Sequence, residues 1–221
     1  MTQMSGVMDS KLYEYMLSKG IRESALLTRL REETAKDPLA RMQISPEQGQ
    51  FMKLLVSIVQ PQTILEIGTF TGYSSLCMAM ASNDDCHITT CDNDESWTAI
   101  AKRYWQEAGV EQKVTLKLGE ALSTLDSLAN EGKSNSFDLI FLDADKENYP
   151  NYFIKLKALL KVGGLLLIDN VFWSGKVADS SDVSTATSGV RELNDALHKD
   201  KDFEISMIPI SDGLTIAKKL V

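Results

Sequence analysis

The chain has 221 residues, of which 43% are hydrophobic and 24% are charged, and its formal net charge is −8. This length fits one domain of ordinary size and is short for two, and the composition excludes disordered, collagen-like and coiled-coil proteins. Because the negative charge repels phosphate backbones and anionic lipids, we expect neither nucleic acid nor a membrane as a partner.

The first residues contain no basic segment followed by an apolar run, and no stretch approaches the roughly 18 apolar residues of a membrane span. We therefore expect a cytoplasmic protein. The three cysteines, Cys77, Cys86 and Cys91, form no Cys-x-x-Cys pair and are expected to be reduced thiols. With two histidines in the sequence, a zinc site of nitrogen and sulfur ligands cannot be assembled, so any metal requires oxygen ligands.

Residues 9–36 show helical patterning in two blocks that end before Pro38. We expect residues 1–45 to form a helical extension and residues 46–221 to form the core of a single domain. Ser45 and Gln48 match a capping box, with Ser45 as the N-cap and Gln48 at the third helical position. The following helix should end near Pro61, and its apolar spacing predicts one stripe facing a core, formed by Phe51, Leu54, Leu55, Ile58 and Val59.

From residue 62 onward, short apolar runs alternate with helical segments. The runs are residues 63–68, 87–92, 113–119, 137–143 and 164–169. This alternation predicts an α/β fold with right-handed crossovers and a doubly wound, mostly parallel sheet covered on both faces. Near the C-terminus, two strand-like runs flank Asp212-Gly213, which predicts an antiparallel hairpin at the edge of the sheet.

The predicted strands lead into acids at their carboxyl ends. Glu66, Asp92, Asp143 and Asp169 stand at the ends of four of the five runs. Because ligands bind outside the carboxyl ends of the strands in an open parallel sheet, we expect these acids to converge on one crevice. A helix N-cap would explain one such acid, but four are harder to explain by capping alone.

The first strand is followed by a glycine-containing turn, residues 68–72, and then by a helix. Glycines permit a tight turn and close approach of a ligand, and the helix N-terminus offers free amides to an anionic group. The turn does not match the Gly-x-Gly-x-x-Gly pattern, because Phe70 and Tyr73 occupy its second and third glycine positions. An NAD-dependent oxidoreductase is therefore kept only as an alternative.

Four features together resemble one family: LEIGTFTGYSS at residues 65–75, Asp92, FDLIFLDADKENYPNY at residues 137–152, and LLLIDNVFWSGKV at residues 165–177. They are similar to the cation-dependent O-methyltransferases that use S-adenosylmethionine, the caffeoyl-CoA and catechol O-methyltransferase group. The resemblance runs from about Met42 to the C-terminus. It implies a seven-stranded, Rossmann-like class I methyltransferase fold with a reversed last strand, and an S-adenosylmethionine-binding core over residues 46–221.

By position, the resemblance implies a set of cofactor-binding residues. Glu66 and Gly68 would line the methionine part of S-adenosylmethionine, and Ser74 would contact its carboxylate. Asp92 would take the ribose hydroxyls, and Ala121 would stand beside the adenine. The full set consists of Ile44, Glu66, Gly68, Thr69, Ser74, Asp92, Ala121, Asp143, Asp145 and Tyr152.

The resemblance also implies a divalent cation held by Asp143, Asp169 and Asn170, with Lys146 as the general base; Lys146, Asp143 and Asn170 would be the catalytic residues. Hard oxygen ligands suit Mg²⁺, Ca²⁺ or Mn²⁺. A vicinal diol on such an ion would lose a proton more easily, and Lys146 could accept it if burial or the ion's field keeps the amine neutral. The expected reaction is methyl transfer to a hydroxyl of a catechol-like small molecule.

Met42, Lys146 and Trp173 are expected to face the acceptor, although Trp173 also fits a core or dimer aromatic. Residues 174–188 are rich in Ser, Thr and Asp and predict a mobile loop that decides acceptor selectivity together with residues 1–43.

The aromatic residues of the helix at 95–108 show ordinary core patterning. The resemblance implies a homodimer. A catalytically silent cofactor-binding module stays open as a second alternative, whereas methylation of nucleic acid is disfavoured because Asp-Ala-Asp-Lys replaces the Asn-Pro-Pro-Tyr type of loop.

Overall fold

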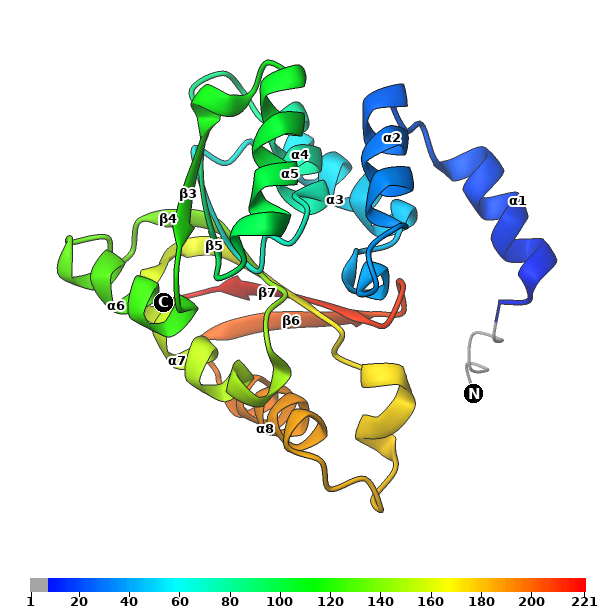
Figure 1. The fold of residues 1–221 in the computed structure, drawn as a ribbon. Helices are drawn as coiled ribbons and strands as arrows, with labels where there is room; N and C mark the ends of the chain where they lie inside the picture. Colours follow the sequence, from blue (N-terminus) through cyan, green and yellow to red (C-terminus); the bar gives the residue numbers. More distant parts are fainter. Residues whose placement is uncertain (1–7) are drawn as a thin grey trace.

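A computed structural model describes residues 8–221, and seven strands of this range form its central sheet (Figure 1). They are β1 (Thr63–Ile67), β2 (His87–Asp92), β3 (Val114–Leu118), β4 (Phe137–Leu142), β5 (Leu160–Asp169), β6 (Phe203–Ile208) and β7 (Leu214–Lys219). Their order across the sheet is β3-β2-β1-β4-β5-β7-β6. Strands β1 to β5 pair in parallel, whereas β7 is antiparallel to both β5 and β6. The predicted fold class, with its reversed C-terminal hairpin, is confirmed.

Among the five predicted runs, one strand departs from its expected bounds by more than one residue. β5 was expected to begin at residue 164, but it begins at Leu160, directly after helix α7 (Tyr149–Leu159). Leu160 pairs with Phe137 before a register shift in the ladder between β4 and β5. The strand therefore starts earlier because the end of α7 is already held against the sheet.

Helices cover both faces of the sheet (Figure 1). One face carries α2 (Ala25–Thr34), α3 (Pro46–Val59), α4 (Tyr73–Ala81) and α5 (Glu95–Glu107), and the other carries α6 (Ala121–Asn130), α7 and α8 (Thr185–Lys199). Short 3-10 turns stand at η1 (Ala40–Met42), η2 (Glu111–Lys113), η3 (Lys146–Asn148) and η4 (Trp173–Ala178). Within residues 8–221, no helix combines the length and the apolar character that crossing a bilayer requires.

The central strands supply both cores, one on each face. Leu65 and Ile67 of β1 join the cluster under α7, whereas Ile64 belongs to the cluster under α3 and α4. On β4, Ile140 and Phe141 divide in the same way. This alternation explains why these strands are apolar on both pleat faces, as buried parallel strands are.

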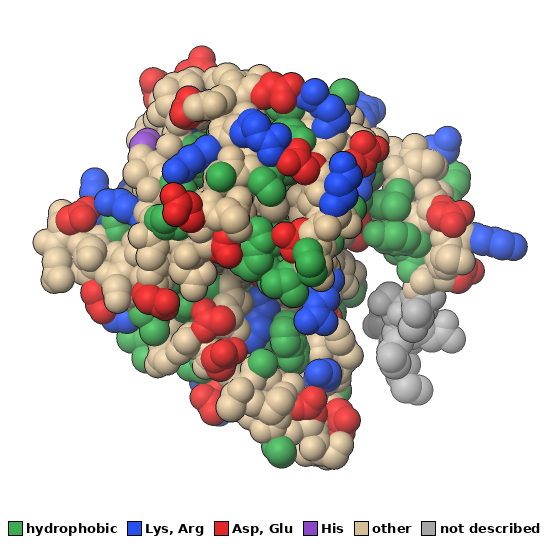
Figure 2. All heavy atoms as spheres, in the orientation of Figure 1, with side chains coloured by type: hydrophobic (Ala, Val, Ile, Leu, Met, Phe, Trp, Pro, Cys, Tyr) green, Lys and Arg blue, Asp and Glu red, His purple; other side chains and the backbone are tan. Residues whose placement is uncertain are grey.

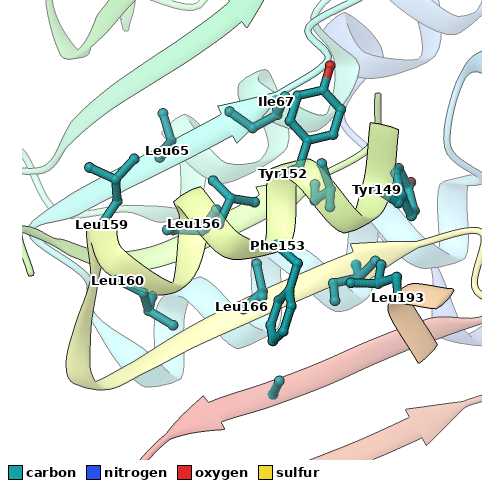
Figure 3. Packing of buried hydrophobic residues seen from close by; sticks show 14 of the residues in the cluster. Leu65, Ile67, Tyr149, Tyr152, Phe153, Leu156, Leu159, Leu160, Leu166 and Leu193 are labelled. Atoms are coloured by element: carbon teal, nitrogen blue, oxygen red, sulfur yellow. The ribbon is translucent and has the colours of Figure 1, made fainter. Parts of the chain in front are cut away.

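Helix α7 contributes much of the first cluster (Figure 3). Phe153, Leu156 and Leu159 point from the helix toward β1 and β5, and Leu156 is completely buried. Because α7 follows the loop at the end of β4, this packing also determines where that loop lies.

Two helices precede the core. Helix α1 (Ser10–Gly20) has no buried residue and stands to one side in Figure 1, whereas α2 buries Leu27 and Leu30. Glu23 accepts hydrogen bonds from Arg31 Nε and Nη2, both at 2.7 Å, and from the Tyr73 hydroxyl at 2.6 Å. These bonds connect α2 to α4. The division of the chain at residue 45 stays a prediction, and the first seven residues of the expected extension lie outside the described range.

Helix α3 begins and ends near its predicted bounds but presents a different face to the core. Ser45 Oγ accepts a hydrogen bond from Gln48 N at 3.4 Å, so the N-cap is confirmed. The other half of the capping box is wrong, because the Gln48 side chain is fully buried and has no hydrogen-bond partner. The predicted apolar stripe is correct in part: Phe51 and Leu55 pack against the core, whereas Leu54 and Ile58 are 56% and 69% exposed.

The buried face of α3 consists of Gln48, Gly49, Met52 and Val56. A Cβ atom at Gly49 would meet Tyr73 Cε1 at 2.7 Å, so only glycine permits this approach of α3 to α4. The close approach at Gly49 explains the rotation of α3, and it turns Gln48 inward.

The amino ends of β1 and β4 are joined by Asp138. Its Oδ2 atom accepts hydrogen bonds from the backbone N of Gln62 and of Thr63, both at 2.9 Å, and its Oδ1 accepts from Lys161 Nζ at 2.7 Å. Burial opposes ionisation of this carboxyl, but the hydrogen bonds from Lys161 and Thr63 outweigh burial and lower its pKa.

We expect Asp138→Ala to lower the free energy of unfolding by about 2 kcal/mol near neutral pH, because several hydrogen bonds to one carboxylate are lost together. Since the folded-state pKa is lowered, the contribution is complete above the pKa of an unfolded aspartate and is lost as the pH falls through the lowered value. Urea titrations of both proteins near pH 7 and near pH 3 measure the two effects.

Asp126→Ala is the control, because Asp126 pairs with Lys155 on the surface, where ion pairs contribute less than about 1 kcal/mol. Equal losses in the two variants would contradict the role assigned to Asp138.

Candidate active site

The carboxyl ends of β1, β2, β4 and β5 border a cavity of about 1170 Å³. Figure 2 shows a hollowed face on which acidic, basic and hydrophobic side chains lie close together. All the predicted site residues except Glu66 line the cavity: Met42, Ile44, Gly68, Thr69, Ser74, Asp92, Ala121, Asp143, Asp145, Lys146, Tyr152, Asp169, Asn170 and Trp173. The structure brings these residues together, while the role of each stays a prediction.

The turn after β1 lies against the loop after β4. Gly68 has a φ of +97°, and a Cβ atom there would stand 2.0 Å from the carbonyl oxygen of Asp143. Asp143 N donates to Ile67 O at 2.8 Å, and Gly68 N donates to Cys91 O at 3.0 Å. Glycine at position 68 thus allows two strand ends to meet, in addition to any approach of a ligand.

Asp92, at the end of β2, holds the same turn. Its Oδ2 accepts hydrogen bonds from the backbone N of Thr69 at 3.0 Å and of Phe70 at 2.8 Å, and its Oδ1 accepts from Asp94 N at 2.9 Å. The side chain predicted to take ribose hydroxyls therefore also fixes the backbone after β1.

Glu66 lies beneath the turn, which is why it does not line the cavity. It is completely buried, and its carboxyl accepts hydrogen bonds from Ser74 Oγ at 2.5 Å and from Thr90 Oγ1 at 2.6 Å. Burial raises the pKa of Glu66 to about 8, the two hydroxyls act against burial, and the charges of Asp143 and Asp92 add to the rise. Ser74, predicted to contact a ligand carboxylate, is thus engaged with Glu66 in this structure.

Lys146 forms an ion pair at the opposite wall. Its Nζ donates to Asp143 Oδ1 at 2.8 Å and to Ala144 O at 2.9 Å, and it stands 4.8 Å from the centre of the Tyr149 ring and 5.8 Å from that of Trp173. Burial acts to lower the pKa of this amine, but the charge of Asp143 outweighs burial and raises it. Burial alone therefore does not keep the amine neutral while the pair with Asp143 is intact.

Asp169 is the last residue of β5, Asn170 follows it, and both line the cavity. Asp169 is only 2% exposed, and its Oδ1 accepts a hydrogen bond from Asn170 N at 2.7 Å. Burial, and after it the charge of Asp143, raises the pKa of Asp169 well above the usual range. Asn170 adopts a left-handed conformation with a φ of 56°, which asparagine tolerates better than most residues.

The donor atoms of Asp143, Asp169 and Asn170 fit a hard divalent cation, because they are two carboxylates and one amide oxygen. A positive charge near Asp169 would offset both its burial and its repulsion by Asp143. In the part of the chain that the structure describes, no group of three His, Cys, Asp or Glu side chains is arranged to hold a metal ion. The predicted set differs from such a group because its third member is an asparagine.

Asp145 and Tyr152 line the cavity as a bonded pair. The Tyr152 hydroxyl donates to Asp145 Oδ1 at 2.6 Å, and Asn148 Nδ2 donates to Asp145 Oδ2 at 2.5 Å. This arrangement supports their assignment to one side of the cavity.

Three aromatic residues that the sequence interpretation did not assign to the site also line the cavity: Phe70, Tyr73 and Trp97. Phe70 and Trp97 form an edge-to-face pair, with ring centres 4.9 Å apart. Trp97 Nε1 donates to Asp37 Oδ2 at 3.0 Å, which connects α5 to the N-terminal segment. Tyr104 and Trp105 of α5 are core residues as expected, but Trp97 is not. Its place one turn after the end of β2 was the signal that could have identified it.

The segment after Trp173 is more ordered than a loop over residues 174–188 implies. It contains η4, and α8 begins at Thr185. From α8, Arg191 Nε donates to Val177 O at 3.0 Å, Nη1 to Asp182 O at 2.7 Å, and Nη2 to Lys176 O at 2.8 Å and to Asp179 O. One guanidinium therefore holds the segment through four backbone carbonyls.

The C-terminal hairpin also reaches the cavity through Ser211 and Asp212, which the sequence interpretation treated only as a turn. Asp212 Oδ1 accepts a hydrogen bond from Ser174 N at 2.7 Å. The hairpin thus holds the beginning of the segment after Trp173, while Arg191 holds the rest of it.

Comparisons with known proteins were made by sequence and by structure. Residues 17–220 match the model of a family described as O-methyltransferase. The chain is 41% identical over 217 residues to the caffeoyl-CoA O-methyltransferase of Eucalyptus gunnii, covering 95% of this chain and 87% of that protein. It is 36% identical over 212 residues to catechol O-methyltransferase domain-containing protein 1 of Mus musculus, covering 96% and 81%. The O-methyltransferase TomG of Streptomyces achromogenes, solved in complex with S-adenosylmethionine, has a TM-score of 0.86 at 30% identity over 96% of each chain.

The raised pKa of Glu66 predicts a pH-dependent effect of Glu66→Gln. Between the ordinary glutamate pKa and about 8, the folded wild-type protein keeps a proton that the unfolded chain releases, so this stabilisation is lost as the pH rises through about 8. The glutamine variant has no such loss. We expect its stability relative to wild type to rise by roughly 1.4 kcal/mol per pH unit over this window. Urea titrations of the ligand-free proteins at several pH values measure the difference.

Glu107→Gln is the control, since Glu107 forms an exposed pair with Arg29. A pH-independent difference between Glu66→Gln and wild type would show that Glu66 is ionised throughout this range.

Proposed function

The chain belongs to the O-methyltransferase family, and from this premise we propose that it transfers the methyl group of S-adenosylmethionine to a hydroxyl of a small catechol-like acceptor with the help of a divalent cation. The observation that carries the proposal is that Asp143, Asp169 and Asn170 line the same cavity as the turn after β1. The cation ligands and the turn that would bind the cofactor therefore border the same cavity, in which the methyl donor and the acceptor would meet.

The β1 and β2 side of the cavity suits the cofactor. When bound, S-adenosylmethionine supplies an electrophilic methyl group on its sulfonium. The first turn of α4 presents free backbone amides and the positive end of its helix to the methionine carboxylate. Asp92, Ala121 and Tyr152 line the cavity. Asp92 would offer carboxylate oxygens to the ribose hydroxyls, while Ala121 and Tyr152 would border the cofactor.

The cation would be held by Asp143, Asp169 and Asn170. When bound, it supplies positive charge that lowers the pKa of a neighbouring hydroxyl group. Mg²⁺ is the ion we propose first, with Ca²⁺ and Mn²⁺ compatible with the same oxygen donors.

Lys146 is the proposed proton acceptor at its Nζ atom. In this structure, the charge of Asp143 raises the pKa of this amine. Once the charge of Asp143 is engaged elsewhere, the buried environment of Lys146 favours the neutral amine, which accepts the hydroxyl proton of the acceptor. General base catalysis of this kind contributes about 10²- to 10⁴-fold.

The acceptor would lie between Met42 and Trp173, which line the cavity from two sides. The Trp173 ring stands close to Lys146, so a stacked acceptor ring would bring a hydroxyl toward the base. We propose that residues 174–188 and the N-terminal segment decide which acceptor fits.

The two alternative functions have less support. An NAD-dependent oxidoreductase requires a pyrophosphate loop that the turn at Phe70 and Tyr73 lacks, and the family match is to O-methyltransferases. A catalytically silent module is disfavoured because Asp143, Lys146 and Asp169 all carry competent side chains that line the cavity.

Asp169→Ala and Asp92→Ala test the division of roles. We expect Asp169→Ala to reduce cation-dependent turnover of a catechol by at least about 100-fold while leaving the Kd for S-adenosylmethionine largely unchanged, because the residue serves the cation. Asp92→Ala should weaken S-adenosylmethionine binding about tenfold or more, because hydrogen bonds to a charged group are lost. Isothermal titration and turnover assays with and without EDTA measure both effects.

Equal loss of cofactor binding in the two variants would contradict this division. Turnover that is indifferent to EDTA would remove the cation from the mechanism.

We also propose that the chain forms a homodimer. An isolated helix as short as α1 is marginal in water, yet no residue of α1 is buried. Large hydrophobic side chains are exposed on α1 and α3, at Leu12, Tyr15, Leu54 and Ile58. A second copy that covers these side chains would account for both observations.

Ile58→Glu should shift the protein toward monomer, because it places a charge in the proposed contact. Ile154→Glu is the matched control, since Ile154 is equally exposed, at 69%, but lies on α7. Sedimentation equilibrium measures the assembly, and a wild-type protein that is monomeric at micromolar concentration would refute the dimer.

A further inference from the structure

The buried side chain of Gln48 has no evident use in the fold. Among residues 8–221, four buried side-chain atoms lack a hydrogen-bond partner, and two of them are Nε2 and Oε1 of Gln48. Gln48 is 0% exposed, so water does not satisfy these atoms at the surface. A buried amide without partners destabilises a protein, and an apolar side chain of similar shape would avoid that cost.

Two of the three residues with unpartnered atoms, Gln48 and Thr215, lie near the end of β5. The Gln48 amide lies beside the Asp169 carboxyl, but the two groups do not reach hydrogen-bonding geometry. Of the other two atoms, Nε2 of Gln43 belongs to a residue that lines the cavity, and Oγ1 of Thr215 belongs to the residue of β7 that pairs with Ile168. Unused hydrogen-bonding capacity therefore borders the proposed cation ligands.

Asp169 itself is incompletely satisfied. Its Oδ1 accepts one hydrogen bond, from Asn170 N, and within the described range no donor reaches its Oδ2 at hydrogen-bonding geometry. A buried carboxylate and a buried amide thus lie beside each other, and each could accept or donate further hydrogen bonds. The close approach of α3 to α4 at Gly49 keeps the amide in place.

We propose that Gln48 is a positioning residue of the cation site: its amide orients Asp169 and binds a water molecule that accompanies the cation, and this role is the reason that it is buried. The inference rests on the proposed function, because it requires that the site take a divalent cation. It implies that Gln48 lowers the stability of the cation-free protein and raises its affinity for the cation. Removing the amide should therefore move these two properties in opposite directions.

The test uses Gln48→Leu, Gln48→Glu and, as a matched control on the same helix, Gln50→Leu, whose amide contacts only Arg22 N near the surface. The probe is Mn²⁺ alone, with its Kd measured by isothermal titration in the absence of cofactor and acceptor. The second readout is the urea midpoint of each protein in excess EDTA. Neither measurement depends on catalytic activity.

For Gln48→Leu we expect a Kd for Mn²⁺ that is about 10- to 100-fold weaker, as is typical when a group that orients a metal ligand is removed. In EDTA, the same variant should unfold at a higher urea concentration than wild type, because an unsatisfied buried amide has been removed. Gln48→Glu should bind Mn²⁺ at least as tightly as wild type and unfold at a lower urea concentration in EDTA, since it adds a buried carboxylate. Gln50→Leu should leave the Kd unchanged.

Several results would overturn the proposal. A wild-type Kd in Gln48→Leu would show that the amide does not serve the cation, and a lower urea midpoint for this variant would show that the amide has partners in the fold. Loss of Mn²⁺ binding in Gln48→Glu would also contradict it. These outcomes differ from failure of the proposed function, in which the wild-type protein itself would bind no Mn²⁺.

Discussion

The rest of the structure depends on the crowding of carboxyl groups at the carboxyl ends of the strands. Burial raises the pKa of both Glu66 and Asp169, and the charge of Asp143 adds to each rise. Lys146 offsets this charge through its bond to Asp143. Because removing like charges from water is costly, this end of the sheet is held in place by packing elsewhere, above all by α7 under the loop after β4 (Figure 3).

The acids differ in how many hydrogen bonds their carboxyl groups accept from the rest of the chain, and this difference parallels the two roles proposed for them. Glu66 is bonded by two hydroxyls, Asp92 by three backbone amides, and Asp145 by Tyr152 and an asparagine. These groups are oriented before any ligand arrives, as preorganised sites require. Asp169 retains spare capacity beside an amide that also lacks partners. Glu66, Asp92 and Asp145, which we propose for cofactor binding, each accept at least two hydrogen bonds, whereas Asp169, a proposed cation ligand, accepts one from residues 8–221.

Much of this arrangement could be predicted from the sequence, because strand order and the two-residue period decide which side chains reach the carboxyl edge of the sheet. The hairpin at Asp212-Gly213 was predictable for a similarly local reason, since its turn chemistry is contained in adjacent residues. The face of α3 was not, because a close approach between Gly49 and Tyr73 overrides its apolar spacing. The protonation of Lys146 was also inaccessible, since it depends on the distance from its Nζ to the carboxyl of Asp143. Sequence patterns report local periodicity, and contacts between distant segments decide the rest.

The way in which Arg191 holds the segment after Trp173 bears on how such a protein diversifies. All four of its hydrogen bonds end on backbone carbonyl oxygens, which every residue type possesses. Substitutions at the side chains of this segment therefore leave its anchoring intact. Evolution, or an engineer, can vary the chemistry that borders the cavity at these positions without rebuilding the scaffold that presents it.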